Sequence, residues 1–137
     1  MSDLRIPPHV SPLSRPFWDA AARHELVRPV CDECGRSFFV PRPACPHCLS
    51  ETWSWVPSAG RGCVQSHTTV HRAPRAGFEV PYIVADIDLD EGWNMMSNVI
   101  EVASGAVTIG QRVAVTYLDL ADGVTLPVFR PDIEAIV

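Results

Sequence analysis

Two Cys-x-x-Cys pairs constrain the fold of this chain more than any other feature of its sequence. The pairs, Cys31/Cys34 and Cys45/Cys48, are separated by ten residues. Each pair sits on a tight turn that directs two sulfur atoms at one point, and two such turns brought together form a tetrahedral site suited to structural zinc. Four thiolates leave no open coordination position, so this pattern predicts a metal that stabilises the fold and takes no part in catalysis.

Disulfides and unconnected thiols are the alternatives to a metal at these four cysteines. The first eight residues carry neither the basic segment nor the apolar run of a secretory signal peptide, and no apolar run approaches the roughly 20 residues of a membrane helix. A cytoplasmic chain keeps its thiols reduced, which disfavours disulfides. The paired spacing then favours metal, and zinc over iron. We therefore expect a cytoplasmic protein with one structural Zn²⁺.

The charge distribution argues against a polyanionic partner for the second half of the chain. The 137 residues include 16 acids and 11 basic residues, all of them Arg, for a net charge of −5. Residues 1–75 hold nine Arg and six acids, a net of +3, whereas residues 76–137 hold two Arg and ten acids, a net of −8. Nucleic-acid binding draws on clustered positive charge, which this second half lacks.

The first 28 residues are expected to form an extended arm and a helix. Residues 1–15 contain three prolines and no apolar periodicity, which predicts an arm that orders only against another surface. Ser14 is suited to cap a helix over residues 16–27, with a proline in its first turn. Phe17 and Trp18 give this short helix a large aromatic area, and two interpretations stay open: packing on the chain's own domain, or binding of a partner protein.

Residues 29–52 are predicted to form a rubredoxin-like zinc ribbon. Phe38-Phe39-Val40 reads as a short strand between its two cysteine turns, and the prolines that follow it break pairing. A module of this size is too small to bury a core. Metal binding is therefore expected to supply most of its folding free energy.

Residues 53–137 show strand patterns. Trp53 and Trp55 alternate with polar residues as a short first strand or lead-in. Five longer strands follow, at residues 63–71, 80–89, 93–102, 111–118 and 124–130. Asp90–Gly92 and Asp122–Gly123 provide turns. Five short strands with a hairpin between the second and third predict a closed OB-fold barrel, so the fold class is mainly β, with an N-terminal helix and zinc ribbon before the barrel.

The order and spacing of several short motifs resemble a family of zinc-ribbon, OB-fold accessory proteins long known as a domain of unknown function. The resemblance covers nearly the whole chain. Its marks are Pro-Phe-Trp at 16–18, Cys-x-x-Cys-Gly at 31–35, Cys-Pro-x-Cys at 45–48, Pro-Tyr at 81–82 and Asp-Leu-Asp-Glu-Gly at 88–92. The resemblance implies a small subunit that accompanies thiolase-superfamily enzymes in acyl-CoA metabolism, including aldolases that shorten steroid side chains, and that supports the acyl-CoA site of its partner.

A catalytic role is not indicated for the fifth cysteine or for the acidic strand. Cys63 lacks a nearby base: His67 falls on the same strand face but about 13 Å along an extended strand, so a core or surface thiol is favoured. Asp86, Asp88 and Asp90 alternate onto one face, which favours a solvated strand face over a calcium or magnesium site. Glu91 has no second carboxylate or His at a telling interval for acid–base chemistry.

His71, Arg72 and Arg75 cluster where the first long strand enters its loop. Arg suits bidentate phosphate contacts, so a contact with the phosphates of CoA is one interpretation, and an ordinary solvated loop is the other. Arg61 is separated from this cluster by a strand of about 30 Å.

The sequence and the resemblance together indicate a non-catalytic accessory subunit that binds a thiolase-superfamily enzyme, such as a thiolase, acyltransferase or aldolase, and supports its acyl-CoA site. The alternative is a single-stranded nucleic-acid-binding OB protein, which would use Tyr82, Trp93 and Tyr117 as stacking platforms. A third reading, an independent acyl-CoA thioesterase or acyltransferase, lacks a nucleophile–base pair in the sequence.

Overall fold

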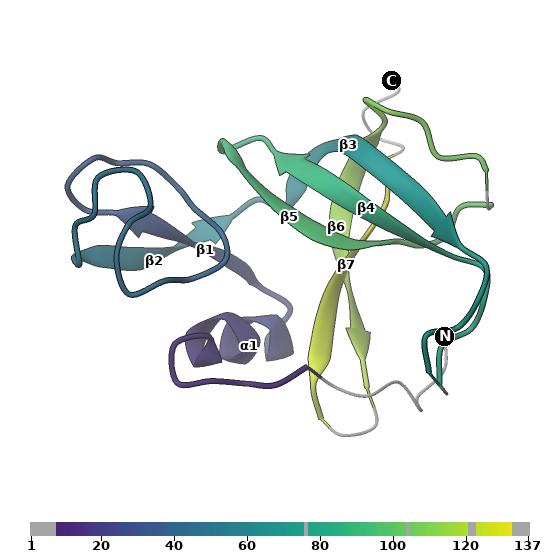
Figure 1. The fold of residues 1–137 in the computed structure, drawn as a ribbon, viewed down its shortest axis with the longest axis horizontal. Helices are drawn as coiled ribbons and strands as arrows, with labels where there is room; N and C mark the ends of the chain where they lie inside the picture. The colour runs from purple at the N-terminus through teal and green to yellow at the C-terminus, as the bar shows by residue number, and fades with distance from the viewer. Residues whose placement is uncertain (1–7, 76, 104, 121–122, 133–137) are drawn as a thin grey trace.

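A two-stranded sheet and a closed barrel make up the molecule, with one helix beside both (Figure 1). The structure is a computed structural model that describes residues 8–75, 77–103, 105–120 and 123–132. Residues 1–7 of the expected arm and Asp122 of an expected turn lie outside these ranges. The predicted class, mainly β with an N-terminal helix, a ribbon region and a five-stranded barrel, is confirmed.

The barrel consists of five strands in the order β3-β4-β5-β7-β6. Their bounds are β3 Arg61–Val70, β4 Tyr82–Leu89, β5 Trp93–Val99, β6 Arg112–Asp119 and β7 Thr125–Pro131. All neighbours pair antiparallel except β5 and β7, which are parallel and share a single register pair, Val99 with Phe129. Strict alternation along β4 buries every second residue, so one face of this strand lines the barrel core and the other faces outward.

The N-terminal helix is shorter than the sequence predicts. Helix α1 covers Arg15–Ala22 and not residues 16–27, and Leu26 and Val27 belong instead to strand β1, Leu26–Cys31. The helix stops because His24 adopts a φ of 60°, while the N–H groups of residues 23–25 donate back to the carbonyls of Ala20 and Ala21. The extended chain after this cap pairs with a partner strand that lies far away in the sequence, which local propensity does not reveal.

Two strand expectations in the ribbon are corrected. Strand β2, Trp53–Ser58, is not a lead-in of the barrel: it pairs antiparallel with β1 in a sheet of its own. The expected strand at Phe38–Val40 is absent from the described structure, where Ser37 forms only an isolated bridge with Val30. Phe38 packs beside Cys31 and Cys45 and Phe39 packs on Phe17 and Trp93, whereas Val40 is 54% exposed, so the apolar pattern of the first two residues reflects burial and not strand pairing.

A chain of aromatic rings joins the ribbon, the helix and the barrel. Phe17 is 5% exposed, and its ring centre lies 5.3 Å from that of Phe39 and 6.5 Å from that of Trp55. Phe39 continues the contact to Trp93 of the barrel at 5.4 Å. Trp53 extends the contact from Trp55 into the ribbon at 5.4 Å. This packing holds the two sheets in a fixed relation through α1.

The described part of the chain contains no helix long and apolar enough to cross a lipid bilayer; its one helix has eight residues.

Candidate metal centre and apolar groove

Four cysteine sulfur atoms gather at the ribbon's two turns. The Sγ atoms of Cys31, Cys34, Cys45 and Cys48 all lie within 4.8 Å of one another. Cys31 Sγ is 3.5 Å from Cys48 Sγ, and Cys34 Sγ is 3.8 Å from Cys45 Sγ. A tetrahedral zinc ion with Zn–S bonds near 2.3 Å needs sulfur atoms about 3.8 Å apart. The donor set and its spacing therefore fit a four-thiolate zinc site.

Backbone N–H groups donate to the first sulfur of each turn. The amides of Cys34 and Glu33 each donate to Cys31 Sγ at 3.4 Å, and the amide of His47 donates to Cys45 Sγ at the same distance. The N–H of Cys34 is the main cause that lowers the pKa of Cys31 to about 7, against an opposing desolvation. These donors favour the thiolate, which is the form that binds metal.

The two turns have the same hydrogen-bond pattern but different residues at the closing position. Gly35 N donates to Cys31 O at 3.0 Å, and Leu49 N donates to Cys45 O at 2.8 Å. Both residues adopt a left-handed backbone, with φ of 74° and 68°. Glycine takes this conformation without strain, whereas a leucine side chain does not. The second turn therefore stores backbone strain at Leu49.

The two aromatic residues of α1 have different surroundings. Phe17 is buried among the contacting aromatic rings that join the ribbon, the helix and the barrel, so its ring is not at the surface of this molecule. Trp18 is half-buried, and its ring packs edge-on against Phe17 at 5.0 Å. Both residues line an open groove, and Trp18 is the more exposed of the two.

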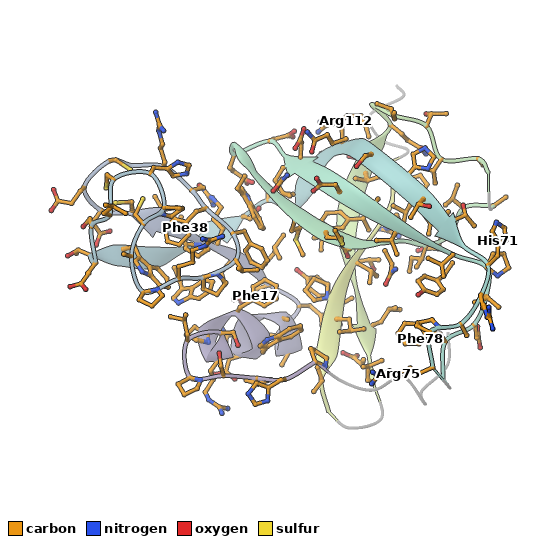
Figure 2. All side chains as sticks on the ribbon, viewed as in Figure 1. Phe17, Phe38, His71, Arg75, Phe78 and Arg112 are labelled. Carbon is orange, nitrogen blue, oxygen red and sulfur yellow. The ribbon has the colours of Figure 1, made fainter. Side chains whose placement is uncertain are left out.

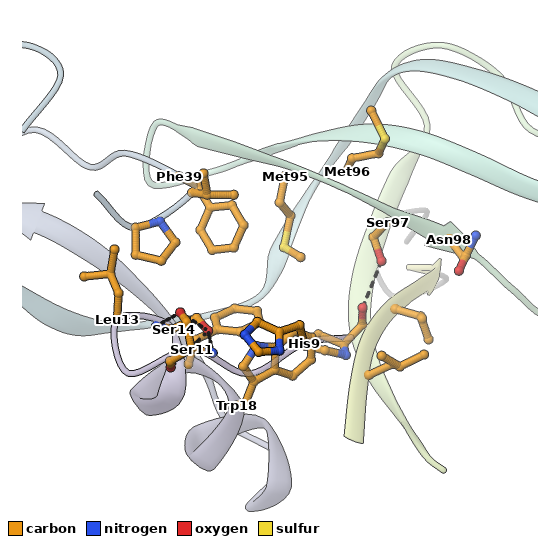
Figure 3. A pocket seen from close by; sticks show the side chains of 16 residues that line it. His9, Ser11, Leu13, Ser14, Trp18, Phe39, Met95, Met96, Ser97 and Asn98 are labelled. Atoms are coloured by element: carbon orange, nitrogen blue, oxygen red, sulfur yellow. Dashed lines mark hydrogen bonds between the residues drawn. The ribbon is translucent and has the colours of Figure 1, made fainter. Parts of the chain in front are cut away.

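The groove holds about 450 Å³ and lies between the N-terminal arm, α1, the ribbon loop and strands β5 and β7 (Figure 3). The residues that line it are mainly apolar: His9, Ser11, Leu13, Ser14, Phe17, Trp18, Phe39, Val40, Pro41, Met95, Met96, Ser97, Asn98, Leu126, Pro127 and Val128. Of these residues, only Phe17 and Trp18 were expected from the sequence as candidates for partner contact. The other segments are far apart along the chain, so no local signal identifies the groove.

The cationic cluster proposed for CoA lies elsewhere. His71, Arg72 and Arg75 are all exposed on the loop between β3 and β4. Figure 2 shows His71 and Arg75 at the end of the barrel away from Phe38 of the ribbon. The same loop carries Phe78, whose ring stacks on Tyr82 at 5.3 Å. The contact of this cluster with CoA remains a prediction. The cluster lies apart from the metal centre.

Two family models together match most of the chain. The one described as "ChsH2, rubredoxin-like zinc ribbon domain" matches residues 18–54, and "ChsH2, C-terminal OB-fold domain" matches residues 55–126, more than half of the sequence. The chain belongs to the ChsH2 family of zinc-ribbon, OB-fold proteins. The expected family resemblance is thereby confirmed.

Similar proteins include subunits of CoA-ester enzymes. The ChsH2-family chain is 40% identical to a "Probable enoyl-CoA hydratase alpha subunit" of Thermomonospora curvata, over 84% of this chain and 36% of that protein. It is 36% identical to the "3-oxo-4,17-pregnadiene-20-carboxyl-CoA hydratase alpha subunit" of Mycobacterium tuberculosis, over 85% of this chain and 37% of that protein. The chain thus spans just over a third of the length of these two relatives.

A solved structure described as "Ltp2-ChsH2(DUF35) aldolase" contains a chain of the same size and fold. It superposes with a TM-score of 0.84 at 36% identity, and covers 91% of this chain and 98% of that one. The zinc-ribbon and OB-fold architecture is therefore shared along nearly the whole length of both chains.

A bulge separates Cys63 of this ChsH2-family chain from His67. The register of β3 with β4 shifts between Val64 and Ser66, so Cys63 pairs with Asp88 while Ser66 pairs with Asp86. Cys63 and Ser66 therefore share the outward face, and His67 takes the opposite one. The expectation that His67 shares a face with Cys63 is wrong, because a bulge reverses the alternation on which it relied.

The acidic face of β4 faces outward, and a bidentate ion pair lies at its end. Asp86 and Asp88 alternate outward along β4, as expected. Asp90 forms a bidentate pair with Arg112, with nitrogen–oxygen distances of 2.8 and 2.6 Å. The hydrogen bonds and charge of Arg112 lower the pKa of the Asp90 carboxyl against an opposing desolvation. No set of three acids with metal-binding spacing occurs among the described residues; the cysteine cluster is the one group that meets this criterion.

Glu91 has a structural role that the sequence did not reveal. Its carboxylate accepts hydrogen bonds from the Ser58 hydroxyl at 2.8 Å, the Ala59 N–H at 2.8 Å and the Trp93 indole N–H at 3.1 Å. Burial alone would raise the pKa of Glu91, but these three donors and the charge of Arg28 lower it. The carboxylate thereby links the chain leaving the ribbon to the hairpin between β4 and β5.

A second unanticipated link joins the end of α1 to strand β6. The His24 ring stacks on Tyr117 with ring centres 4.8 Å apart and planes 9° apart. His24 Nε2 lies 3.3 Å from Asp119 Oδ1, an oxygen that also accepts the Thr125 hydroxyl at 2.6 Å. These contacts join the segment just after α1 to the barrel strand β6, in addition to the aromatic contact at Trp93.

Proposed function

We propose that this chain is a non-catalytic accessory subunit that binds a thiolase-superfamily enzyme and supports its acyl-CoA site, in lipid or steroid side-chain metabolism. The observation that carries the proposal is the match to the chain of the "Ltp2-ChsH2(DUF35) aldolase", of which 98% is covered. The names of the two hydratase relatives point to CoA esters and, in one case, to a steroid-derived acyl group. The proposal includes a cytoplasmic location, where the four thiols stay reduced for metal.

The cysteines have a structural role in this proposal and take no part in catalysis. We propose that Cys31, Cys34, Cys45 and Cys48 hold one Zn²⁺, which supplies a rigid cross-link between the two turns of the ribbon. Four sulfur ligands complete its coordination, so the ion offers no position for substrate. The outward Cys63 pairs with Asp88 and Arg112 in the strand register, and neither neighbour is the histidine that most often activates a cysteine nucleophile.

If this chain binds only the folded form of the partner enzyme, it stabilises that form by mass action. The gain is about 2.7 kcal/mol when the concentration of this chain is a hundred times the Kd. The decisive experiment co-expresses this chain with each thiolase-superfamily enzyme of its source organism. We expect a complex in size-exclusion chromatography with light scattering, and CoA-ester affinity or turnover that neither protein has alone. Turnover of an acyl-CoA ester by this chain alone, abolished in Cys63→Ala, would overturn the proposal.

Phe17 and Trp18 provide a matched pair for locating the contact. Phe17→Ala removes a buried ring and should lower the free energy of unfolding by about 3–5 kcal/mol. Trp18→Ala leaves the core in place and should weaken binding of the partner by about 2 kcal/mol or more, if Trp18 is an interface anchor. Unchanged partner affinity in Trp18→Ala, together with a lower melting temperature, would assign Trp18 to the fold alone.

A further inference from the structure

The apolar groove beside Trp18 faces strand edges and not strand faces. Two runs of consecutive residues line it, 95–98 of β5 and 126–128 of β7. Successive side chains along a strand point to opposite faces, so a run of consecutive residues lines a groove only where the main-chain edge faces it. Figure 3 shows Met95 and Met96 pointing to opposite sides of β5, while Ser97 reaches toward β7.

Strand β5 is paired on one side only for most of its length. Its register with β4 runs without a break from Trp93 to Val99. On the other side, the described residues give it a single register pair, Val99 with Phe129 of β7. One side-chain link crosses the gap, from the Ser97 hydroxyl to the Pro127 carbonyl at 2.9 Å. Residues 93–98 therefore form an edge, and the N–H and C=O groups of such an edge can accept a further strand.

The groove has no carboxylate, ammonium or guanidinium group, which limits what it accepts. None of its sixteen lining residues is Asp, Glu, Lys or Arg, although 20% of the chain is charged. Its serines already have partners within the protein: Ser11 and Ser14 bond to each other, and Ser97 bonds to Pro127. A charged occupant would lose its hydration without compensation here. The complementary occupant is uncharged and apolar.

The rim of the groove favours a macromolecule over an enclosed small ligand. Leu13, Val40 and Met96 line the groove and are 37%, 54% and 72% exposed. The apolar surface thus continues outward from the groove onto its surroundings. An apolar area that spreads around a recess is typical of protein–protein contact, whereas small-molecule sites enclose most of their ligand.

We propose that this groove receives an extended, uncharged segment of the partner enzyme, which adds a strand to the edge of β5 at residues 93–98. Main-chain hydrogen bonds to β5 supply affinity, and the segment's alternate apolar side chains enter the groove toward Trp18 and Met95. This inference rests on the proposed function for the identity of the partner, and on the groove's own geometry for the mode of binding.

The first test compares the free chain with its complex with the thiolase-superfamily enzyme. Hydrogen exchange should slow at the alternate amides of residues 93–98 that point away from β4, and stay unchanged at those of β6. Val40→Glu places a charge in the groove and should weaken the complex at least about tenfold. Ile109→Glu is the matched control, because Ile109 is 73% exposed and lies outside the groove. It should leave the affinity unchanged.

A complex that forms without protection of residues 93–98, or that Val40→Glu and Ile109→Glu weaken equally, would overturn the inference and leave the proposed function standing. Protection already present in the free chain and lost on deletion of residues 1–7 would also overturn it, because the occupant would then be the chain's own N-terminal segment.

A second test does not depend on the partner. The chain has three methionines, Met1, Met95 and Met96, and two of them line the groove. In a sample with ¹³C-labelled methionine methyl groups, an uncharged seven-residue peptide of alternating Thr and Val, capped at both ends, should shift the Met95 signal at about 1 mM, the scale of a weak site. Val40→Glu should abolish the shift. No shift at Met95 would overturn the inference, whatever the partner does.

Discussion

The Ser58 hydroxyl donates to Glu91 Oε1 at 2.8 Å, and this bond ties the last residue of β2 to the hairpin between β4 and β5. The adjacent Ala59 N–H donates to the other carboxylate oxygen at the same distance. Gly60 follows with a φ of 72°, and a Cβ atom there would lie 2.2 Å from Val115. The ribbon–barrel connection is therefore fixed by one carboxylate and by one position that only glycine can occupy.

Glu91→Gln should destabilise the protein by about 1–3 kcal/mol, because the amide loses the negative charge that accepts three hydrogen bonds and places N–H groups opposite one of these donors. The measurement is the midpoint of urea unfolding, followed by tryptophan fluorescence. Glu51→Gln removes an exposed charge near the ribbon and serves as the control. Equal stability of the two variants would show that the link through Glu91 contributes nothing.

Acid should weaken the fold through the same carboxylate. Hydrogen bonds lower the pKa of Glu91 below its ordinary value, and Arg112 does the same for Asp90. A group with a lowered folded-state pKa contributes stability that is complete above its unfolded pKa, about 4.3 for Glu, and lost as the pH falls through the folded value. Unfolding measured from pH 7 to pH 3 should show a smaller acid loss in Glu91→Gln than in the wild type. Thiolate protonation affects both proteins alike, so identical pH profiles would refute this assignment.

Elemental analysis should find about one zinc ion per chain if the four thiolates complete its coordination. Replacing any one of Cys31, Cys34, Cys45 or Cys48 with Ser should release the metal and unfold the ribbon before the barrel, because metal binding and ribbon folding are one equilibrium. Cys63→Ser is the control and should keep its zinc. Stoichiometric iron, or a folded ribbon without metal, would contradict the prediction.

Replacing the glycine in the first cysteine turn and introducing a glycine in the second should change the stability of the ribbon in opposite directions. Gly35→Ala forces a side chain into the left-handed region and should lower the stability of the ribbon by about 1 kcal/mol. Leu49→Gly relieves that strain in the second turn, at little loss of packing because Leu49 is 77% exposed, and should raise stability by up to about 1 kcal/mol. Competition with a zinc chelator measures both effects. A weaker zinc site in Leu49→Gly would show that the leucine side chain, and not its backbone strain, matters.

Neutralising the exposed cluster tests its proposed contact with CoA. The triple variant His71→Ala, Arg72→Gln, Arg75→Gln should raise the KM of the complex for an acyl-CoA ester and leave complex formation intact. An unchanged KM would identify the cluster as an ordinary solvated loop.

Local patterns in the sequence determined the elements of this protein. The spacing of the four cysteines predicted their convergence, and the alternation of apolar residues predicted five barrel strands, because cysteine turns and strand faces depend on residues only a few positions apart. The predicted helix was too long for the same reason. Leu26 and Val27 continue a helical apolar pattern, but the strand that pairs with them begins at Trp53, 26 positions after Val27.

Tertiary structure alone decided how those elements meet. The bulge in β3 moved His67 away from the face of Cys63, and the pairing of β1 with β2 drew Trp53 out of the barrel and into the ribbon. Glu91 acquired three donors, and the β5 edge acquired its groove, from segments separated by tens of residues. Such contacts leave no periodic trace, because the energy that forms them comes from burial and hydrogen bonding between distant parts of the chain and not from local backbone preference.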